Sequence, residues 1–179
     1  MVDWAFSFSA LSYIIRKKGC GLMLQSTLCY LERGGAYLML HRVKKEQDAN
    51  RDKWIGVGGK FEPGEDALAC VMREVTEETG LTMQAPAYRG IVDFYCTPWP
   101  AERMHLYTCT QFAGTMTDCS EGTLEWVPKQ AVQDLPIWQG DKIFFDLLAK
   151  DAPFFHLELH YEGDTLVKAV LDGKELALR

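Results

Sequence analysis

The sequence has no excess of positive charge and no regular cysteine framework. Its 19 Lys and Arg residues against 25 Asp and Glu residues give a formal net charge of −6 at pH 7. Proteins that bind nucleic-acid polymers generally carry basic patches for the phosphates, so this partner class is disfavoured. None of the six cysteines belongs to a CxxC pair. We therefore expect reduced, mostly buried thiols and no structural zinc site.

Long hydrophobic runs, internal repeats and low-complexity tracts are also missing. No apolar segment reaches the roughly 20 residues that cross a bilayer, and we expect a cytoplasmic protein without a membrane partner. A hydrophobic content of 47% in 179 residues suits one packed domain. In the first 22 residues an apolar stretch precedes the basic residues 16–18, the reverse of a signal peptide. We predict an N-terminal extension over 1–22, either loosely attached or preceding a true start at Met23, and one domain over 23–179.

Hydrophobic periodicity predicts a mixed α/β domain. Two apolar-rich strands, 26–32 and 36–42, flank a Gly-Gly turn and form a hairpin. Apolar residues at helical spacing predict a helix over 66–79, with Gly80 as its C-terminal cap. The remaining predicted elements are strands at 88–97, 104–112 and 125–127, a helix at 141–150, and a hairpin of 155–161 with 165–171. This order indicates mixed sheets flanked by helices.

Three carboxylates share one face of the predicted helix over 66–79. At 100° per residue, Glu74, Glu77 and Glu78 fall within a sector of about 100°. Like charges at these spacings repel one another, so a solvated acidic face would carry a cost. A hard divalent cation would remove that repulsion, and carboxylate oxygens suit Mg²⁺ or Mn²⁺. The helix also follows a glycine-rich loop ending in Lys60, which can bring backbone groups and a cation to phosphates.

The same segment carries a longer pattern. Gly59 is followed after five residues by Glu65, and after seven more by the run Arg73-Glu-Val-Thr-Glu-Glu-Thr-Gly-Leu81. This pattern resembles the complete box of the Nudix hydrolase family, with every fixed position filled. The likeness extends from about residue 23 to 171, and it implies that family's αβα sandwich with a mixed β-sheet.

The resemblance implies roles for the residues of the box. Glu74, Glu77 and Glu78 are the carboxylates expected to hold Mg²⁺, and Glu74 is also a candidate general base. Arg73 and Glu65 resemble the pair whose salt bridge fixes the helix against its preceding loop.

Further roles fall on residues outside the helix. The carbonyl of Gly58 is expected to be another metal ligand, and Lys60 is expected to contact phosphate. Glu121 stands where related purine triphosphatases place a last acid for the metal. Glu125 is its rival, because strand alternation would put both glutamates on the same side.

The substrate is expected to be a small nucleotide. Trp54, Gly56 and the segment 138–141 resemble the branch that hydrolyses oxidised purine triphosphates such as 8-oxo-dGTP, as MutT-like enzymes do. In that branch a tryptophan stacks on the base and an aspartate binds its edge, roles that would fall to Trp138 and Asp141. The additional candidates for the pocket are Phe94, Met104 and Arg42.

Two departures from that branch keep other functions open. Ile55 replaces an asparagine that reads the base in the animal enzymes, and Gly140 replaces one of two adjacent aspartates. The alternatives are a Nudix hydrolase of a sugar nucleotide and a non-catalytic Nudix module that senses a nucleotide. A complete set of metal-binding carboxylates argues against the sensor, which would have no need of it.

Overall fold

One mixed β-sheet forms the centre of the computed structural model, which describes residues 23–43 and 50–178. Across the sheet lie β11 (Lys174–Glu175), β10 (Thr165–Leu171), β9 (Phe155–Glu162), β5 (Ala87–Thr97), β6 (Glu102–Cys109), β1 (Leu24–Arg33), β2 (Ala36–His41) and β3 (Trp54–Ile55), while β8 (Thr123–Pro128) also pairs with β2. Strands β1 and β6 are parallel, as are β5 and β9, and the other pairs are antiparallel. The predicted extension over 1–22 lies outside the described residues.

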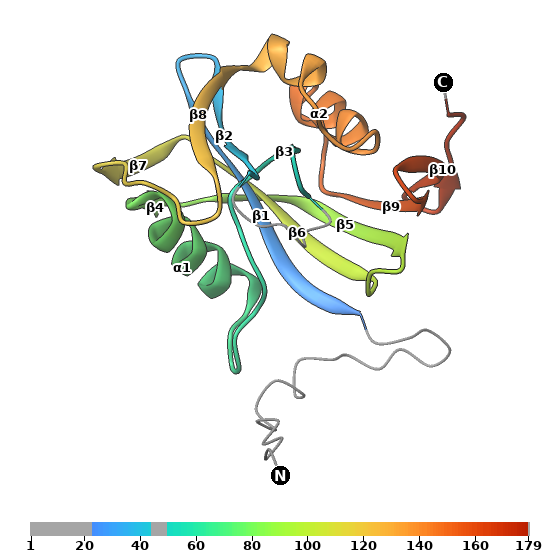
Figure 1. Cartoon of the computed structure of the whole chain (residues 1–179), viewed down its shortest axis with the longest axis horizontal. Coiled ribbons are helices and arrows are strands. Elements are labelled where there is room, and N and C mark those ends of the chain that lie inside the picture. Colours follow the sequence, from blue (N-terminus) through green and yellow to red (C-terminus); the bar gives the residue numbers. More distant parts are fainter. Residues whose placement is uncertain (1–22, 44–49, 179) are drawn as a thin grey trace.

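The sheet is covered by a helix on each face (Figure 1). Because side chains alternate along a strand, Leu28 and Tyr30 of β1 point into one hydrophobic core, and Cys29 and Leu31 point into the other. Helix α2 (Asp141–Ala149) contributes Phe144 and Phe145 to the first core, and helix α1 (Ala67–Thr79) contributes Val71 and Val75 to the second. The expected αβα sandwich is confirmed.

Helix α1 has the ends that its sequence predicts. The Asp66 side chain accepts a hydrogen bond from Ala69 N at 2.8 Å, which satisfies a free donor of the first turn. Gly80 ends the helix at φ 73°, and its N–H donates to Thr76 O at 2.9 Å. A Cβ at Gly80 would lie 2.6 Å from Thr115 O, so glycine is required here for space as well as for conformation.

One predicted strand is wrong in its extent. The sequence suggested a continuous strand over 104–112, but β6 ends at Cys109 and β7 (Gln111–Gly114) begins after Thr110. Strand β7 leaves the main sheet and pairs with β4 (Leu81–Gln84), which directly follows α1. Leu81 and Met83 of β4 are buried in the core beneath α1, so tertiary packing, and not local propensity, divides the segment.

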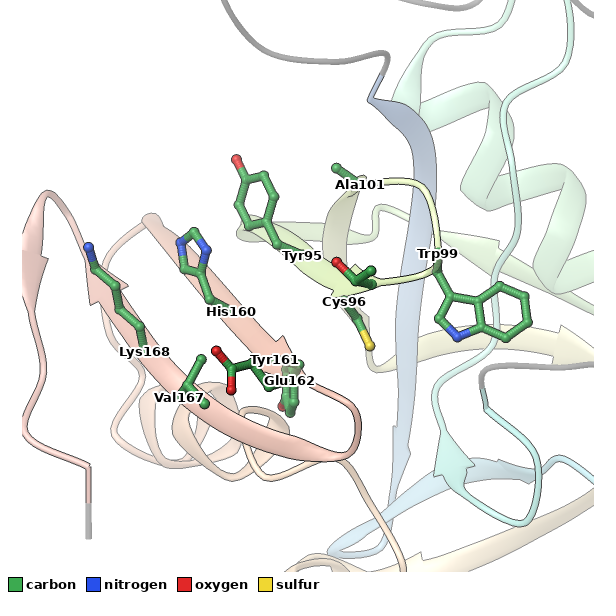
Figure 2. Close-up of a pocket in the computed structure, with 10 residues that line it drawn as sticks. Tyr95, Cys96, Trp99, Ala101, His160, Tyr161, Glu162, Val167 and Lys168 are labelled. Atoms are coloured by element: carbon green, nitrogen blue, oxygen red, sulfur yellow. The ribbon is translucent and has the colours of Figure 1, made fainter.

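The C-terminal hairpin of β9 and β10 extends the sheet and forms an outer groove with the end of β5 (Figure 2). Tyr95 of β5 stacks on His160 of β9 with ring centroids 4.5 Å apart. His156, nearer the start of β9, donates from Nε2 to the buried Asp93 carboxylate at 2.8 Å. Arg103 of β6 forks onto both oxygens of Asp93 at 2.6 Å. Thus buried charge at this end of the sheet is paired across three adjacent strands.

The cysteines of the described chain are free thiols, as expected, and all are buried: Cys29, Cys70, Cys96, Cys109 and Cys119. Among residues 23–43 and 50–178, no helix is long and apolar enough to cross a membrane. The short 3-10 helix η2 (Lys129–Asp134) leads from β8 toward α2.

Candidate active site

A cavity of about 530 Å³ lies between the glycine-rich loop, the sheet and the start of α2. It is lined by most of the site residues expected from the sequence: Arg42, Gly58, Lys60, Arg73, Glu74, Glu78, Phe94, Met104, Glu121, Trp138 and Asp141. Carboxylates and glycines gather at one part of the lining and aromatic side chains at another. The cavity therefore has a charged region and an aromatic region.

The glycine-rich loop is held along β1 by backbone hydrogen bonds. Thr27 N donates to Gly59 O at 2.9 Å, and Cys29 and Val57 exchange bonds of 2.7 and 2.9 Å. A Cβ at Gly58 would collide with the carbonyl oxygen of Thr27, so this close approach requires glycine. The pairing fixes the loop beside the acidic face of α1, where Gly58 N donates to a Glu78 oxygen at 3.2 Å.

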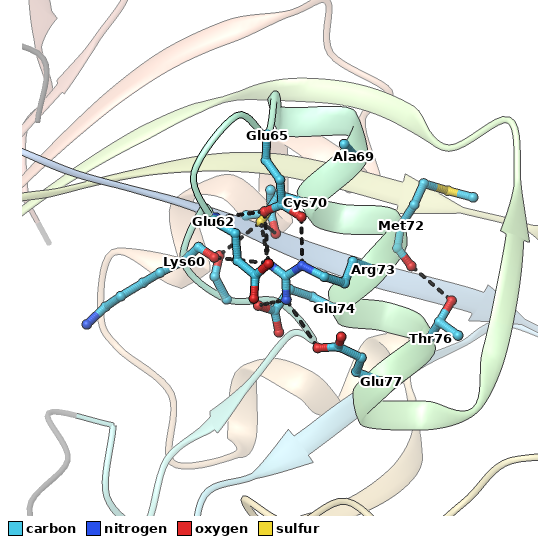
Figure 3. A network of polar contacts seen from close by, with 12 residues as sticks. Lys60, Glu62, Glu65, Ala69, Cys70, Met72, Arg73, Glu74, Thr76 and Glu77 are labelled. Carbon is cyan, nitrogen blue, oxygen red and sulfur yellow. Dashed lines mark hydrogen bonds and ion pairs between the residues drawn. The ribbon is translucent and has the colours of Figure 1, made fainter. Parts of the chain in front are cut away.

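Arg73 joins the loop to the helix (Figure 3). Its guanidinium donates to both oxygens of Glu65, at 2.7 and 2.9 Å, in the expected salt bridge. It also donates to Glu74 at 2.7 Å, to Glu77 at 3.1 Å and to Lys60 O at 3.1 Å. Hydrogen bonds from Arg73 hold the pKa of the Glu65 carboxyl below its usual range. The preceding loop and the first turns of α1 are thereby linked through one cation.

The carboxylates of the charged region repel one another. Burial, with smaller contributions from the nearby charges of Glu121 and Glu74, raises the pKa of Glu78 to about 7. Burial also raises the pKa of Glu74, with the same sign of contribution from Glu77 and Glu121. Arg42 forms an ion pair with Glu121. Acidic groups from α1 and from the segment before β8 are thus crowded into one partly buried place.

This donor set fits a hard divalent cation. Glu74, Glu78 and Glu121 supply carboxylate oxygens of the kind Mg²⁺ and Mn²⁺ prefer, and their mutual repulsion would be relieved by a cation. Glu77, the remaining expected ligand, does not line the cavity; its side chain is 60% exposed and contacts Arg73. As the described side chains stand, no three acidic, histidine or cysteine groups are close enough together to coordinate one ion. Coordination would therefore require these carboxylates to reorient, Glu74 partly away from Arg73.

Three further candidates, Lys60, Glu121 and Glu125, lie at different places relative to the cavity. The Lys60 side chain is exposed and extends away from the carboxylates, at the edge of the cavity (Figure 3). Glu121 precedes β8 and lines the cavity, whereas Glu125 pairs with Met39 in β8, is exposed and does not line it. The structure therefore brings Glu121, and not Glu125, to the carboxylates of α1.

The aromatic region is built around Trp138. Its indole N–H donates to the Asn50 side-chain oxygen at 2.8 Å, and Phe94 and Tyr161 meet it edge to face with centroids 5.1 and 4.9 Å away. The Lys53 ammonium lies 4.3 Å from its ring centroid. Trp138 is only 5% exposed. It forms a wall of the cavity, with most of its ring surface already in contact with protein.

Asp141 begins α2 beside Trp138 and is 5% exposed. Burial raises its pKa to about 8, against a lowering contribution from the charge of Lys53. At neutral pH the carboxyl is therefore largely protonated, and a neutral carboxyl can donate as well as accept a hydrogen bond. A base edge that offers both an acceptor and a donor suits such a group.

Asn50 and Trp99 are among the cavity-lining residues that were not expected from the sequence. Asn50 lies in a polar loop and carried no signal of its contact with the distant Trp138. Trp99 lies between two prolines in the β5–β6 turn and lines the cavity while remaining 45% exposed. Its two flanking prolines indicate a turn, but nothing in the local sequence indicates that the turn reaches the cavity.

The family of the chain follows from its similarity to known proteins. The sequence model of the NUDIX domain matches residues 24–148, a span that contains the glycine-rich loop, α1, Glu121 and the start of α2. The chain belongs to the Nudix family. It is a Nudix hydrolase, so the expected family, enzyme class and fold are confirmed.

Relatives and solved structures agree with this placement. YvcI of Bacillus subtilis, described as an uncharacterized Nudix hydrolase, is 28% identical over 138 residues, which cover 73% of this chain and 82% of YvcI. An oxidized purine nucleoside triphosphate hydrolase of Danio rerio is 24% identical over 132 residues, covering 73% of this chain and 85% of its own. The crystal structure of a MutT protein from Bacillus halodurans superposes with a TM-score of 0.74 and 29% identity, covering 84% of this Nudix chain and 98% of the other.

Proposed function

We propose that this Nudix hydrolase is a cytoplasmic, Mg²⁺-dependent diphosphatase of purine nucleoside triphosphates, with oxidised forms such as 8-oxo-dGTP as leading substrates. Water would attack phosphorus and release a nucleoside monophosphate and pyrophosphate. The observation that carries the proposal is a single cavity in which crowded carboxylates adjoin an aromatic region. Similarity to the oxidized purine nucleoside triphosphate hydrolase of Danio rerio supports the choice of substrate. Its role would be the clearance of damaged nucleotides before they enter DNA.

The charged region would take the phosphates. Glu74, Glu77, Glu78 and Glu121, with the carbonyl of Gly58, would hold Mg²⁺, and Mn²⁺ is an alternative; Glu77 would have to turn from Arg73, which it contacts at 3.1 Å, toward the other carboxylates. Such an ion would neutralise phosphate charge and lower the pKa of the attacking water. Lys60 would add a cation at the edge of the cavity, and Arg73 would keep the loop and α1 in register.

The aromatic region would take the base. Trp138 and Phe94 offer an apolar wall, and the neutral Asp141 carboxyl would bind the edge of a purine. Ile55, which also lines the cavity, has no polar group for a base. Recognition would therefore rest on Asp141 and on shape, and a small nucleotide fits the 530 Å³ cavity where a polymer does not.

The test is hydrolysis by the full chain. The protein is incubated with Mg²⁺ and with dGTP, 8-oxo-dGTP, dATP and a nucleoside diphosphate sugar, and the products are identified by mass spectrometry. We expect pyrophosphate and a monophosphate from the purine triphosphates, loss of turnover with EDTA, and recovery with added Mg²⁺. Glu78→Gln should lower kcat by about 100-fold or more, and Glu77→Gln should also impair turnover.

Glu125→Gln is the matched control, because Glu125 is exposed and outside the cavity; its turnover should be unchanged. Full activity of both Glu77→Gln and Glu78→Gln would overturn the proposal. A higher kcat/KM for the nucleotide sugar would assign the protein to that substrate class instead. Thermal stabilisation by nucleotide and Mg²⁺ without any product would identify a sensor.

A further inference from the structure

Trp99 stands at the mouth of the cavity with its ring accessible. It lies in the β5–β6 turn between Pro98 and Pro100, where its own backbone N–H donates to Cys96 O at 2.7 Å. Proline restricts its own φ and the backbone conformation of the residue before it, so the backbone of the turn that carries the indole is restricted. The side chain is 45% exposed, among the most exposed large hydrophobic groups of the described chain.

The indole of Trp99 has no partner in the part of the chain that the structure describes. No aromatic contact, cation contact or side-chain hydrogen bond involves it within residues 23–43 and 50–178. Figure 2 shows the ring directed away from Tyr95, His160 and Lys168 of the outer groove. An exposed indole leaves a large apolar surface in water, and here that surface borders the proposed nucleotide cavity.

Trp138 offers less. Its edges meet Phe94 and Tyr161, the Lys53 ammonium lies over its ring, and only 5% of it is exposed. A planar base stacks only on an open ring face, because stacking needs overlap at van der Waals distance. Of the two tryptophans that line the cavity, Trp99 therefore has the more accessible face.

We propose that Trp99 is the stacking platform for the nucleobase, and that Trp138 serves as a fixed wall. The proposal rests on the cavity being the nucleotide site, as proposed above, but not on hydrolysis itself. An indole face stacks on any base, since every base has a π-face. Trp99 would therefore raise affinity for nucleotides in general and leave discrimination between bases to Asp141.

Binding of reaction products tests this without turnover. Isothermal titration of the full chain with dGMP, dAMP and deoxyribose 5-phosphate compares two bases with a matched probe that has none. We expect Trp99→Ala to weaken dGMP and dAMP by about ten-fold each, within the range for loss of one base-stacking aromatic. Binding of deoxyribose 5-phosphate should change by less than two-fold. Trp99→Phe, which keeps a π-face, should retain most of the affinity.

Val167→Ala is the control, because Val167 is also 45% exposed and lines the outer groove with Trp99 but not the cavity. It should leave all three affinities unchanged. Equal losses for dGMP and deoxyribose 5-phosphate, an equal effect of Val167→Ala, or no binding of dGMP by the parent would overturn the proposal. If Trp99→Ala loses affinity for dGMP and dAMP but not for deoxyribose 5-phosphate, and the protein hydrolyses no triphosphate, stacking is supported and the proposed function is refuted.

Discussion

Replacing Arg73 should destabilise the fold by about 3 kcal/mol. The Arg73 fork on Glu65 and its bond to Glu74 join groups whose side chains are only 15 to 21% exposed. Hydrogen bonds to charged groups contribute roughly 1.5–3 kcal/mol each, and leaving a buried partner unpaired costs a further penalty. The contact with Glu77, which is 60% exposed, adds little. Because Arg73 is itself partly exposed, we take the low end, about 1.5 kcal/mol for the fork on Glu65 as one interaction and about 1.5 kcal/mol for the bond to Glu74, which gives about 3 kcal/mol.

Urea unfolding measures this loss. With a slope of about 2 kcal/mol per M, Arg73→Ala should lower the midpoint by about 1.5 M. Arg89→Ala is the matched control, because Arg89 bonds at 2.7 Å to Asp151, which is 88% exposed; its loss should stay below about 1 kcal/mol. Arg73→Lys should fall between, because an ammonium cannot fork onto a carboxylate. If Arg73→Ala loses no more than Arg89→Ala, the network does not hold the loop to α1.

Two further outcomes follow from the described contacts. Asp93→Asn should cost about 2 kcal/mol at pH 6. Burial raises the Asp93 pKa, but hydrogen bonds from Arg103 and His156 outweigh this and lower the pKa overall. The stabilisation by ionised Asp93 is therefore complete above about pH 4 and is lost as the pH falls through the pKa of the folded state. Urea unfolding at pH 3 should show a smaller difference in stability between the parent and Asp93→Asn. Gly59→Ala should lower kcat/KM by about 100-fold, because its Cβ would displace the Glu74 carboxylate, while the urea midpoint changes little.

Hydrophobic periodicity was sufficient to predict the helices and strands in which local sequence preference and tertiary packing favour the same structure. Helix α1 was predicted from its apolar stripe and its glycine cap, and the β9–β10 hairpin from alternation around a turn. In each case local preference and tertiary burial agree. They disagree after residue 109, where the chain keeps a strand-like composition but changes partner from β1 to β4. The pattern of side chains along one segment does not indicate which strand pairs with it, so the break between β6 and β7 could not be predicted.

The candidate site likewise has one region that could be predicted from the sequence and one that could not. Its charged region is mostly contiguous in sequence, because a glycine-rich loop and the helix after it bring Gly59, Glu65, Arg73 and Glu74 together by short-range geometry. The Arg73 salt bridge to Glu65 was expected from the resemblance to the Nudix box, which lies within this contiguous segment. Glu121 was the exception, since it and Glu125 share a strand parity, and only the pairing of β8 with β2 from residue 123 separates them.

The aromatic region is assembled from segments that are far apart in the chain. Asn50 bonds to Trp138 across 88 residues, and Trp99 reaches the cavity from a turn that local sequence marks only as a connection. Each of these contacts depends on how β5, β6 and α2 are placed around the sheet, a tertiary property with no local signature. The chemistry of a Nudix hydrolase can therefore be predicted from about two dozen adjacent residues, whereas the residues proposed to bind the base are dispersed along the chain. Substitutions at Asp141 should accordingly change which nucleotides bind, and substitutions at Trp99 should change how tightly all of them bind, in both cases without changing the bond that is cut.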